Sequence, residues 1–161
     1  MDKEKFDRHV EQALVERGIH TPSTMKYGKG TKFWCQNLSN IGKCTIGSNC
    51  TIHSHVWIGD RVKIGDRCRI QAFTFIPTGV RIGNDVFLGP RVTFTNDKHP
   101  PSPEWLVTTV ADGVSIGAGA IVLPGISIGK NAKIGAGAVV TKNIPDGETW
   151  IGNPAKVYRA P

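Results

Sequence analysis

The 161-residue sequence has no apolar run of 18 or more residues, which argues against a membrane-spanning helix. Its first five residues, Met-Asp-Lys-Glu-Lys, lack the apolar segment of a signal peptide, so we expect a cytoplasmic protein. Cysteine is scarce: four residues occur, without CxxC spacing, so reduced thiols are expected in place of a disulfide framework or a zinc site. Clustered charge is also missing, because the basic residues are scattered singly. The net charge of +7 indicates anionic partners but does not favour nucleic acid.

Glycine is abundant, at 19 residues, and accompanies a six-residue repeat. Large apolar residues stand six apart from Ile46 to Phe94, and the pattern resumes at Val110. Four residues after each comes a small or β-branched residue, as at Cys50 and Cys68. A short strand and a corner in every six residues predict a triangular prism with 18 residues per coil, in which glycine at the first corner position allows the bend. Cys50 and Cys68 are 18 apart, so we expect them to be neighbours inside it.

The repeat [Ile/Val/Leu]-Gly-x-x-[small]-x over residues 40–144 resembles that of hexapeptide-repeat acyltransferases. The resemblance implies an all-β, left-handed parallel β-helix in a single domain, and a homotrimer whose ligands bind between neighbouring prisms. We expect the β-helix over residues 32–144 and a C-terminal tail over residues 145–161. Residues 1–31 are expected to form a short helix and a connector, because Phe6, Val10 and Leu14 stand at helical spacing. Since fold alone does not determine chemistry, function is sought where the repeat is violated.

One face of the predicted prism departs from the regular pattern. It holds the hexads that start at Ile52, Ile70 and Leu88. Two columns of unusual residues are expected to stack there. The column that points outward from the strands contains Trp57, Phe75 and Thr93, and the column near the corner contains His55, Phe73 and Arg91. A solvent-facing aromatic ladder is unusual for a monomer. We interpret it as a subunit interface, as a platform for the base or sugar of a substrate, or as both.

The second departure is a loop over residues 95–109, and such loops often carry binding or catalytic residues. His99 can take a proton near neutral pH and is the candidate base, with Asn96 and Asp97 positioning the sugar or a water. His55 is a second candidate base. The stretch Phe-Thr-Asn-Asp-Lys-His-Pro over residues 94–100 resembles both N-acetyltransferases of nucleotide-linked amino sugars and O-acetyltransferases of galactosides and maltose. Trp105 and Thr109 fit the first group better, although that group usually has Pro-Arg where this chain has Pro-Pro.

The C-terminal third resembles the coenzyme A end of these enzymes. The resemblance implies that small residues let the pantetheine arm lie along the prism while backbone N–H groups bind the thioester oxygen. It also implies that basic side chains meet the phosphates of the cofactor. The implied cofactor residues, including the Gly-Asn-Pro-Ala-Lys stretch of residues 152–156, are Gly117, Ala118, Gly135, Ala136, Lys142, Asn153, Pro154, Ala155, Lys156 and Arg159.

These features predict an acetyl-CoA-dependent N-acetyltransferase, without a metal, in which the amine of a nucleotide-linked amino sugar attacks the acetyl group directly. A sugar O-acetyltransferase and a non-enzymatic scaffold remain alternatives. A γ-class carbonic anhydrase shares the prism but needs three histidines converging on zinc, and His53, His55 and His99 are too few and wrongly spaced for that site.

Overall fold

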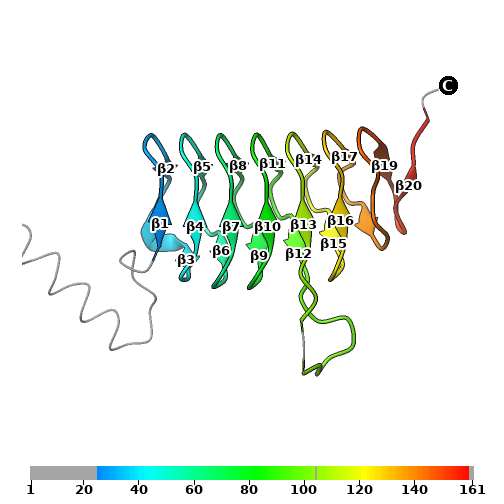
Figure 1. The fold of residues 1–161 in the computed structure, drawn as a ribbon, viewed down its shortest axis with the longest axis horizontal. Helices are drawn as coiled ribbons and strands as arrows, with labels where there is room; N and C mark the ends of the chain where they lie inside the picture. Colours follow the sequence, from blue (N-terminus) through cyan, green and yellow to red (C-terminus); the bar gives the residue numbers. More distant parts are fainter. Residues whose placement is uncertain (1–24, 104, 160–161) are drawn as a thin grey trace, which may run out of the picture.

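The computed structural model describes residues 25–103 and 105–159, and these residues wind into a parallel β-helix (Figure 1). Each coil adds one strand to each of three sheets, and strands 18 residues apart pair in register, as Thr45 does with Lys63 and Lys63 with Arg81. The predicted prism is therefore confirmed. The helix predicted near the N-terminus lies outside the described residues.

The three sheets are named A, B and C in chain order. Sheet A contains β1 (Lys26–Tyr27), β4 (Thr45–Ile46), β7 (Lys63–Ile64), β10 (Arg81–Ile82), β13 (Thr109–Val110) and β16 (Ser127–Ile128). Sheet B contains β2 (Lys32–Phe33), β5 (Thr51–Ile52), β8 (Arg69–Ile70), β11 (Phe87–Leu88), β14 (Ser115–Ile116), β17 (Lys133–Ile134), β19 (Thr149–Ile151) and β20 (Lys156–Val157). Sheet C contains β3 (Asn40–Ile41), β6 (Trp57–Ile58), β9 (Phe75–Ile76), β12 (Thr93–Phe94), β15 (Ile121–Val122) and β18 (Val139–Val140), and the short 3-10 helix η2 (Gln36–Leu38) precedes β3.

The prism extends to β19, which pairs with β17 in the parallel direction. β20 then turns back and pairs with β19 in the antiparallel direction, so the last strand of the parallel ladder is covered rather than left as an open edge.

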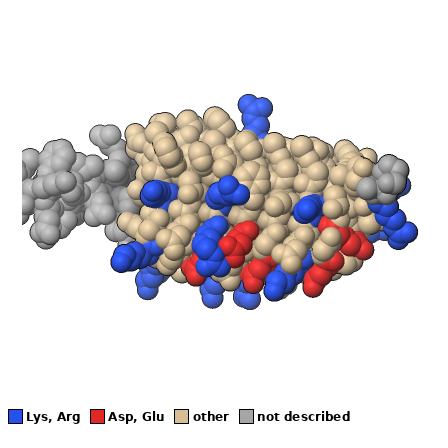
Figure 2. Space-filling model, turned by 90° about the horizontal axis from the view of Figure 1, so that it is seen from above, with Lys and Arg blue, Asp and Glu red and all other residues tan. Residues whose placement is uncertain are grey.

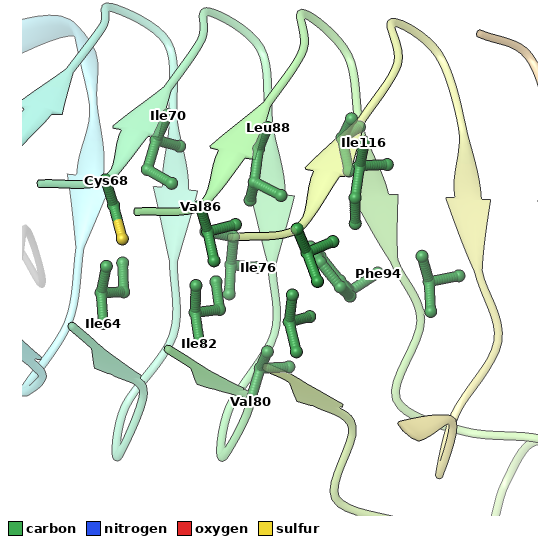
Figure 3. Close-up of a cluster of buried hydrophobic side chains, with 14 of the residues drawn as sticks. Ile64, Cys68, Ile70, Ile76, Val80, Ile82, Val86, Leu88, Phe94 and Ile116 are labelled. Atoms are coloured by element: carbon green, nitrogen blue, oxygen red, sulfur yellow. The ribbon is translucent and has the colours of Figure 1, made fainter. Parts of the chain in front are cut away.

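The interior is a column of aliphatic side chains, one from each strand and one from each corner (Figure 3). Phe94 is the bulkiest of the fully buried side chains. Cys50 and Cys68 are both buried, and the Cys68 backbone N–H donates to Cys50 Sγ at 3.4 Å, which confirms that they are neighbours. The six-residue spacing therefore produces the core directly, because each repeat places its apolar residue at the same point of the coil.

The corners correct one detail of the sequence reasoning. The residue that needs the left-handed region is the third corner position, where His55 has φ 57° and Gly119 has φ 68°. Glycine at the first position serves close packing: a Cβ on Gly59 would lie 2.5 Å from the backbone nitrogen of Thr78 in the next coil. The frequent glycine is therefore required because successive coils approach closely, not because of the bend itself.

The outward residues give the three sheets different surfaces. Sheet C exposes an apolar column, sheet A a basic and hydroxyl-bearing one, and sheet B a mixed one. The sheet C column contains Trp57, Phe75, Thr93, Ile121 and Val139, and the sheet A column contains Lys26, Thr45, Lys63, Arg81, Thr109 and Ser127. In the face that Figure 2 shows, basic and acidic side chains gather along one long edge of the molecule and almost none lie along the opposite edge.

The assignment of the aromatic columns to a single face was therefore wrong. Trp57 and Phe75 begin the strands of sheet C, next to Ile58 and Ile76, whereas the hexads of Ile52, Ile70 and Leu88 begin on sheet B. The reason is that a hexad starts on one sheet, turns the corner and ends on the next. His55, Phe73 and Arg91 lie at the corner between the two sheets.

Candidate functional site

The edge between sheets B and C carries a ladder of stacked side chains. The rings of His55 and Phe73 lie 4.7 Å apart at 17°, and the guanidinium of Arg91 lies 5.9 Å from the Phe73 ring centroid. On sheet C, the rings of Trp57 and Phe75 lie 4.6 Å apart, also at 17°. Both predicted columns are thus formed. Because His55 and Phe73 are exposed, the ladder is available to a ligand or to another chain.

The backbone of this ladder is unusual for such large side chains. His55, Phe73 and Arg91 have φ values of 57°, 62° and 60°, in the left-handed region that glycine and asparagine adopt more readily. Regular corners further along the chain have glycine at the same point, as at Gly119 and Gly137. Non-glycine residues at the other corners, such as Arg67, have the same conformation, so it follows from the geometry of the coil and the edge is a candidate site because of its stacked side chains.

The small-residue corners predicted for coenzyme A continue the same edge. The Arg91 N–H donates to Ala72 at 3.0 Å, the Gly119 N–H to Pro90 at 2.8 Å and the Gly137 N–H to Ala118 at 2.8 Å, so the corners stack without a break. Large side chains project from the edge in the N-terminal half, and glycine and alanine line it in the C-terminal half. Sequence reasoning treated these as two separate features. Third corner positions are 18 residues apart on either side of the loop, but Arg91 and Gly119 are 28 apart, so the two features join only when the ten extra residues of the loop are subtracted.

The remaining residues predicted for the cofactor gather at the C-terminal end. A hollow of about 380 Å³ is lined by Lys142, Pro154, Ala155 and Lys156, together with Trp150, which sequence reasoning did not single out. The Ala155 N–H donates to the Val139 carbonyl at 2.8 Å and so fixes this segment against the end of sheet C. The surface of the hollow is mainly apolar, and the exposed Lys142 and Lys156 are the two cationic residues among its lining.

Three other predicted cofactor residues lie around this end. Asn153 and Arg159 are exposed, outside the lining of the hollow, and Gly135 packs under the terminal segment, where a Cβ would lie 2.7 Å from Ile151 Cγ2. Gly117 is equally constrained, because a Cβ there would lie 2.5 Å from the Ala136 nitrogen. The structure therefore gives both glycines a packing reason, whatever they bind.

The predicted loop leaves the prism after β12 and returns at β13, which begins at Thr109 (Figure 1). Asp97 organises it: Oδ1 accepts the His99 backbone N–H at 3.0 Å and the Ser102 hydroxyl at 2.5 Å, and Oδ2 accepts the Ser102 N–H at 2.8 Å. The hydrogen bonds from Ser102 lower the pKa of the Asp97 carboxyl below its ordinary value. The carboxylate thus holds the backbone at His99.

His99 itself is exposed, and Asn96 is half-buried beside the start of the loop. The loop replaces the corner between sheets C and A, whereas the stacked ladder lies at the corner between sheets B and C. The structure of one chain therefore separates His99 from the ladder by the width of sheet C.

Residues 25–103 and 105–159 contain no group of three or more His, Cys, Asp or Glu that could hold a metal ion. No helix in the described part of the chain is long and apolar enough to cross a bilayer.

Two family models match the repeat. The bacterial transferase hexapeptide (six repeats) matches residues 61–96 and 108–142, and the hexapeptide repeat of succinyl-transferase matches residues 41–76. Together they cover more than half of the chain and leave out the loop. The chain belongs to the hexapeptide-repeat transferases.

Individual relatives match in sequence or in fold. The galactoside O-acetyltransferase of Lactococcus lactis subsp. lactis is 43% identical over 90 residues, which are 51% of this chain and 44% of that protein. The chain thus matches less than half the length of this curated relative.

Among solved structures, AntD, an N-acyltransferase from Bacillus cereus in complex with dTDP and coenzyme A, has a TM-score of 0.74 at 21% identity, covering 92% of this chain and 89% of that one. GDP-perosamine N-acetyltransferase from Caulobacter crescentus, in complex with coenzyme A and GDP-perosamine, has a TM-score of 0.61 at 21% identity, covering 97% and 65%. At these identities the likeness establishes the shared fold.

Proposed function

We propose that this chain is an acyltransferase that moves the acetyl group of acetyl-CoA to the amine of a nucleotide-linked amino sugar. The observation that carries the proposal is the continuous edge between sheets B and C, where a stacked ladder runs into corners of glycine and alanine that end at a basic hollow. A thin thioester arm suits the small-residue corners, and cofactor phosphates suit Lys142 and Lys156. The fold shared with N-acyltransferases that bind coenzyme A supports this assignment.

The proposed chemistry is direct transfer. The amine nitrogen attacks the thioester carbonyl carbon, His99 accepts the proton that the nitrogen loses, and backbone N–H groups stabilise the oxyanion. The carbon–sulfur bond then breaks and the coenzyme A thiolate leaves and takes up a proton. Asp97 acts as a positioning residue, because its carboxylate binds the loop backbone at His99. Asn96 is proposed to hold the acceptor beside that histidine.

The proposal needs more than one copy of the chain, because sheet C separates His99 from the ladder within one prism. The apolar column of sheet C provides the contact: Phe75 and Ile121 are each 37% exposed, and they continue the line of Trp57. Packing this column against a second prism removes it from water and can bring the loop of one chain to the ladder of the next. A homotrimer with three such sites fits this requirement.

The decisive experiment compares His99→Ala with Lys98→Ala, a matched change of the adjacent exposed loop residue. We expect His99→Ala to lower kcat/KM by about 10²–10⁴-fold, the usual effect of losing a general base, with the KM for acetyl-CoA unchanged. Lys98→Ala should retain activity within about threefold. A loss of less than about tenfold in His99→Ala would remove this residue from the role of base, and His55→Ala would then be the variant to measure.

An O-acetyltransferase remains the second candidate, favoured by the 43% identity to a galactoside O-acetyltransferase. An acceptor panel separates the two. Amino sugars linked to UDP, dTDP or GDP should release coenzyme A thiol, which a colorimetric thiol reagent detects. Free galactosides and maltose should not. Release with galactosides alone would replace amine by hydroxyl in the proposal, and release with neither class would refute the sugar assignment.

A further inference from the structure

A second hollow, away from the ladder and the small-residue corners, lies between sheet A and the returning arm of the loop. Its volume is about 760 Å³, within the range of small-molecule sites. Five basic side chains line it, from sheet A and from the corner between sheets C and A, namely Lys26, Lys43, Arg61, Lys63 and Arg81. Trp105 and Val107 of the loop line the other side.

The charge in this hollow is concentrated and unbalanced. Lys63 and Arg81 stand opposite each other on paired parallel strands, about 4.8 Å apart at the backbone, an arrangement of like charges that destabilises a sheet. None of the described residues that line the hollow is acidic. Asp60, at the same corner, uses Oδ1 to accept the Lys43 backbone N–H at 2.7 Å.

The neighbouring corner shows the ordinary arrangement. Between sheets A and B, Arg67 forms an ion pair with Asp85 at 2.7 Å in the next coil, so that positive charge is neutralised within the protein. Within residues 25–103 and 105–159 none of the five basic residues of the hollow forms such a pair. A bound polyanion would supply the missing negative charge.

The aromatic side adds a second requirement. Trp105 borders the hollow and is 51% exposed, so a large part of its indole is free to contact a ligand. Indole faces stack on planar heterocycles and on bases. A ligand that suits the hollow therefore combines closely spaced negative charges with a planar ring at one end.

We propose that this hollow binds the nucleoside diphosphate part of a ligand, with the phosphates at Lys63, Arg81 and Arg61 and the base against Trp105. Two ligands contain this chemistry: a nucleotide-linked sugar and coenzyme A itself. The sugar nucleotide as the source rests on the proposed function, because the residues assigned to coenzyme A lie on a different edge. Binding of a nucleoside diphosphate does not depend on that function. The loop links the two proposals, because Trp105 and His99 belong to it.

The test measures binding by calorimetry, with UDP, dTDP, GDP, inorganic pyrophosphate and coenzyme A as probes. The variant K63A/R81A removes two outward charges from sheet A, and the matched control K32A/R69A removes two outward charges from sheet B. We expect K63A/R81A to weaken nucleoside diphosphate binding at least tenfold and the control to stay within twofold. Trp105→Ala should weaken binding of the nucleotides but leave pyrophosphate binding unchanged.

Each outcome is decisive. If no nucleoside diphosphate binds to the wild-type protein, or if the two double variants behave alike, the proposal is wrong. If K63A/R81A affects UDP, dTDP or GDP but leaves coenzyme A binding intact, the source is the sugar nucleotide; the reverse identifies coenzyme A. Acetyl transfer is measured separately. Activity in K63A/R81A with unchanged KM values for both the acceptor and acetyl-CoA refutes this site alone, whereas nucleotide binding without any transfer refutes the proposed function alone.

Discussion

Two phenylalanines in one coil test which part of the prism maintains stability. Phe94, on β12, is 0% exposed and points into the core, whereas Phe87, on β11, points outward from sheet B and is half-buried. Truncation of a fully buried phenylalanine to alanine costs about 3–5 kcal/mol, because apolar contacts are lost and a cavity remains. Phe87→Ala removes mainly the contact with Arg69, whose guanidinium lies 5.3 Å from the ring centroid, and such exposed contacts contribute about 0.5–1 kcal/mol.

We therefore expect Phe94→Ala to lower the free energy of unfolding by about 3–5 kcal/mol and Phe87→Ala by about 1 kcal/mol. For a domain whose total stability is about 5–15 kcal/mol, the first change is severe and the second is tolerated. Urea unfolding followed by circular dichroism, at one fixed chain concentration, measures both. Equal losses in the two variants, or a loss below about 1 kcal/mol in Phe94→Ala, would contradict the inward column as the source of stability. Since β12 leads into the loop, Phe94→Ala should also reduce activity.

Three further predictions concern the thiols, the apolar face and the loop. Cys35 is exposed, whereas the other three thiols are buried, and burial raises the pKa of Cys44 to about 11. A thiol reagent at pH 8 should therefore modify one cysteine in the native protein and four in denaturant. Rapid modification of a second cysteine in the native protein would contradict the burial of these three side chains in the core. Trp57→Asp should dissociate the proposed homotrimer in sedimentation experiments, and an intact, fully stable trimer would count against sheet C as the contact. Because hydrogen bonds lower the Asp97 pKa, they stabilise the loop fully above the ordinary value of 3.8 and are lost as pH falls through the lowered pKa. NMR titration should place that carboxyl below 3.8, and Ser102→Ala should move it back towards 3.8.

The proposed site depends on residues of two kinds. The small-residue corners and the basic C-terminal hollow are recognisable from their residues, because glycine and alanine recur there at the spacing of the coil. Asp97 is different: its type suggested contact with a sugar, yet its carboxylate accepts three hydrogen bonds from its own loop. Local backbone geometry decides such a role, and no residue pattern expresses it.

The second hollow, between sheet A and Trp105, could not be anticipated from the sequence either. Lys63 and Arg81 are 18 apart and predictable as neighbours, but Trp105 lies in an irregular loop whose return path has no period. A repeat specifies positions only where the chain follows it. Where the chain leaves the repeat, the position of each side chain depends on packing over the whole molecule.

The sequence by itself determined the prism, its core and its two departures from regularity, because a six-residue period places every apolar residue at a fixed point of an 18-residue coil. Tertiary structure alone decided which sheet the aromatic side chains occupy, since each hexad turns a corner before it ends. It also decided that the ladder and the small-residue corners form one edge, and that the loop returns over sheet A. These are contacts between coils and across the loop, and they exist only once the chain has folded.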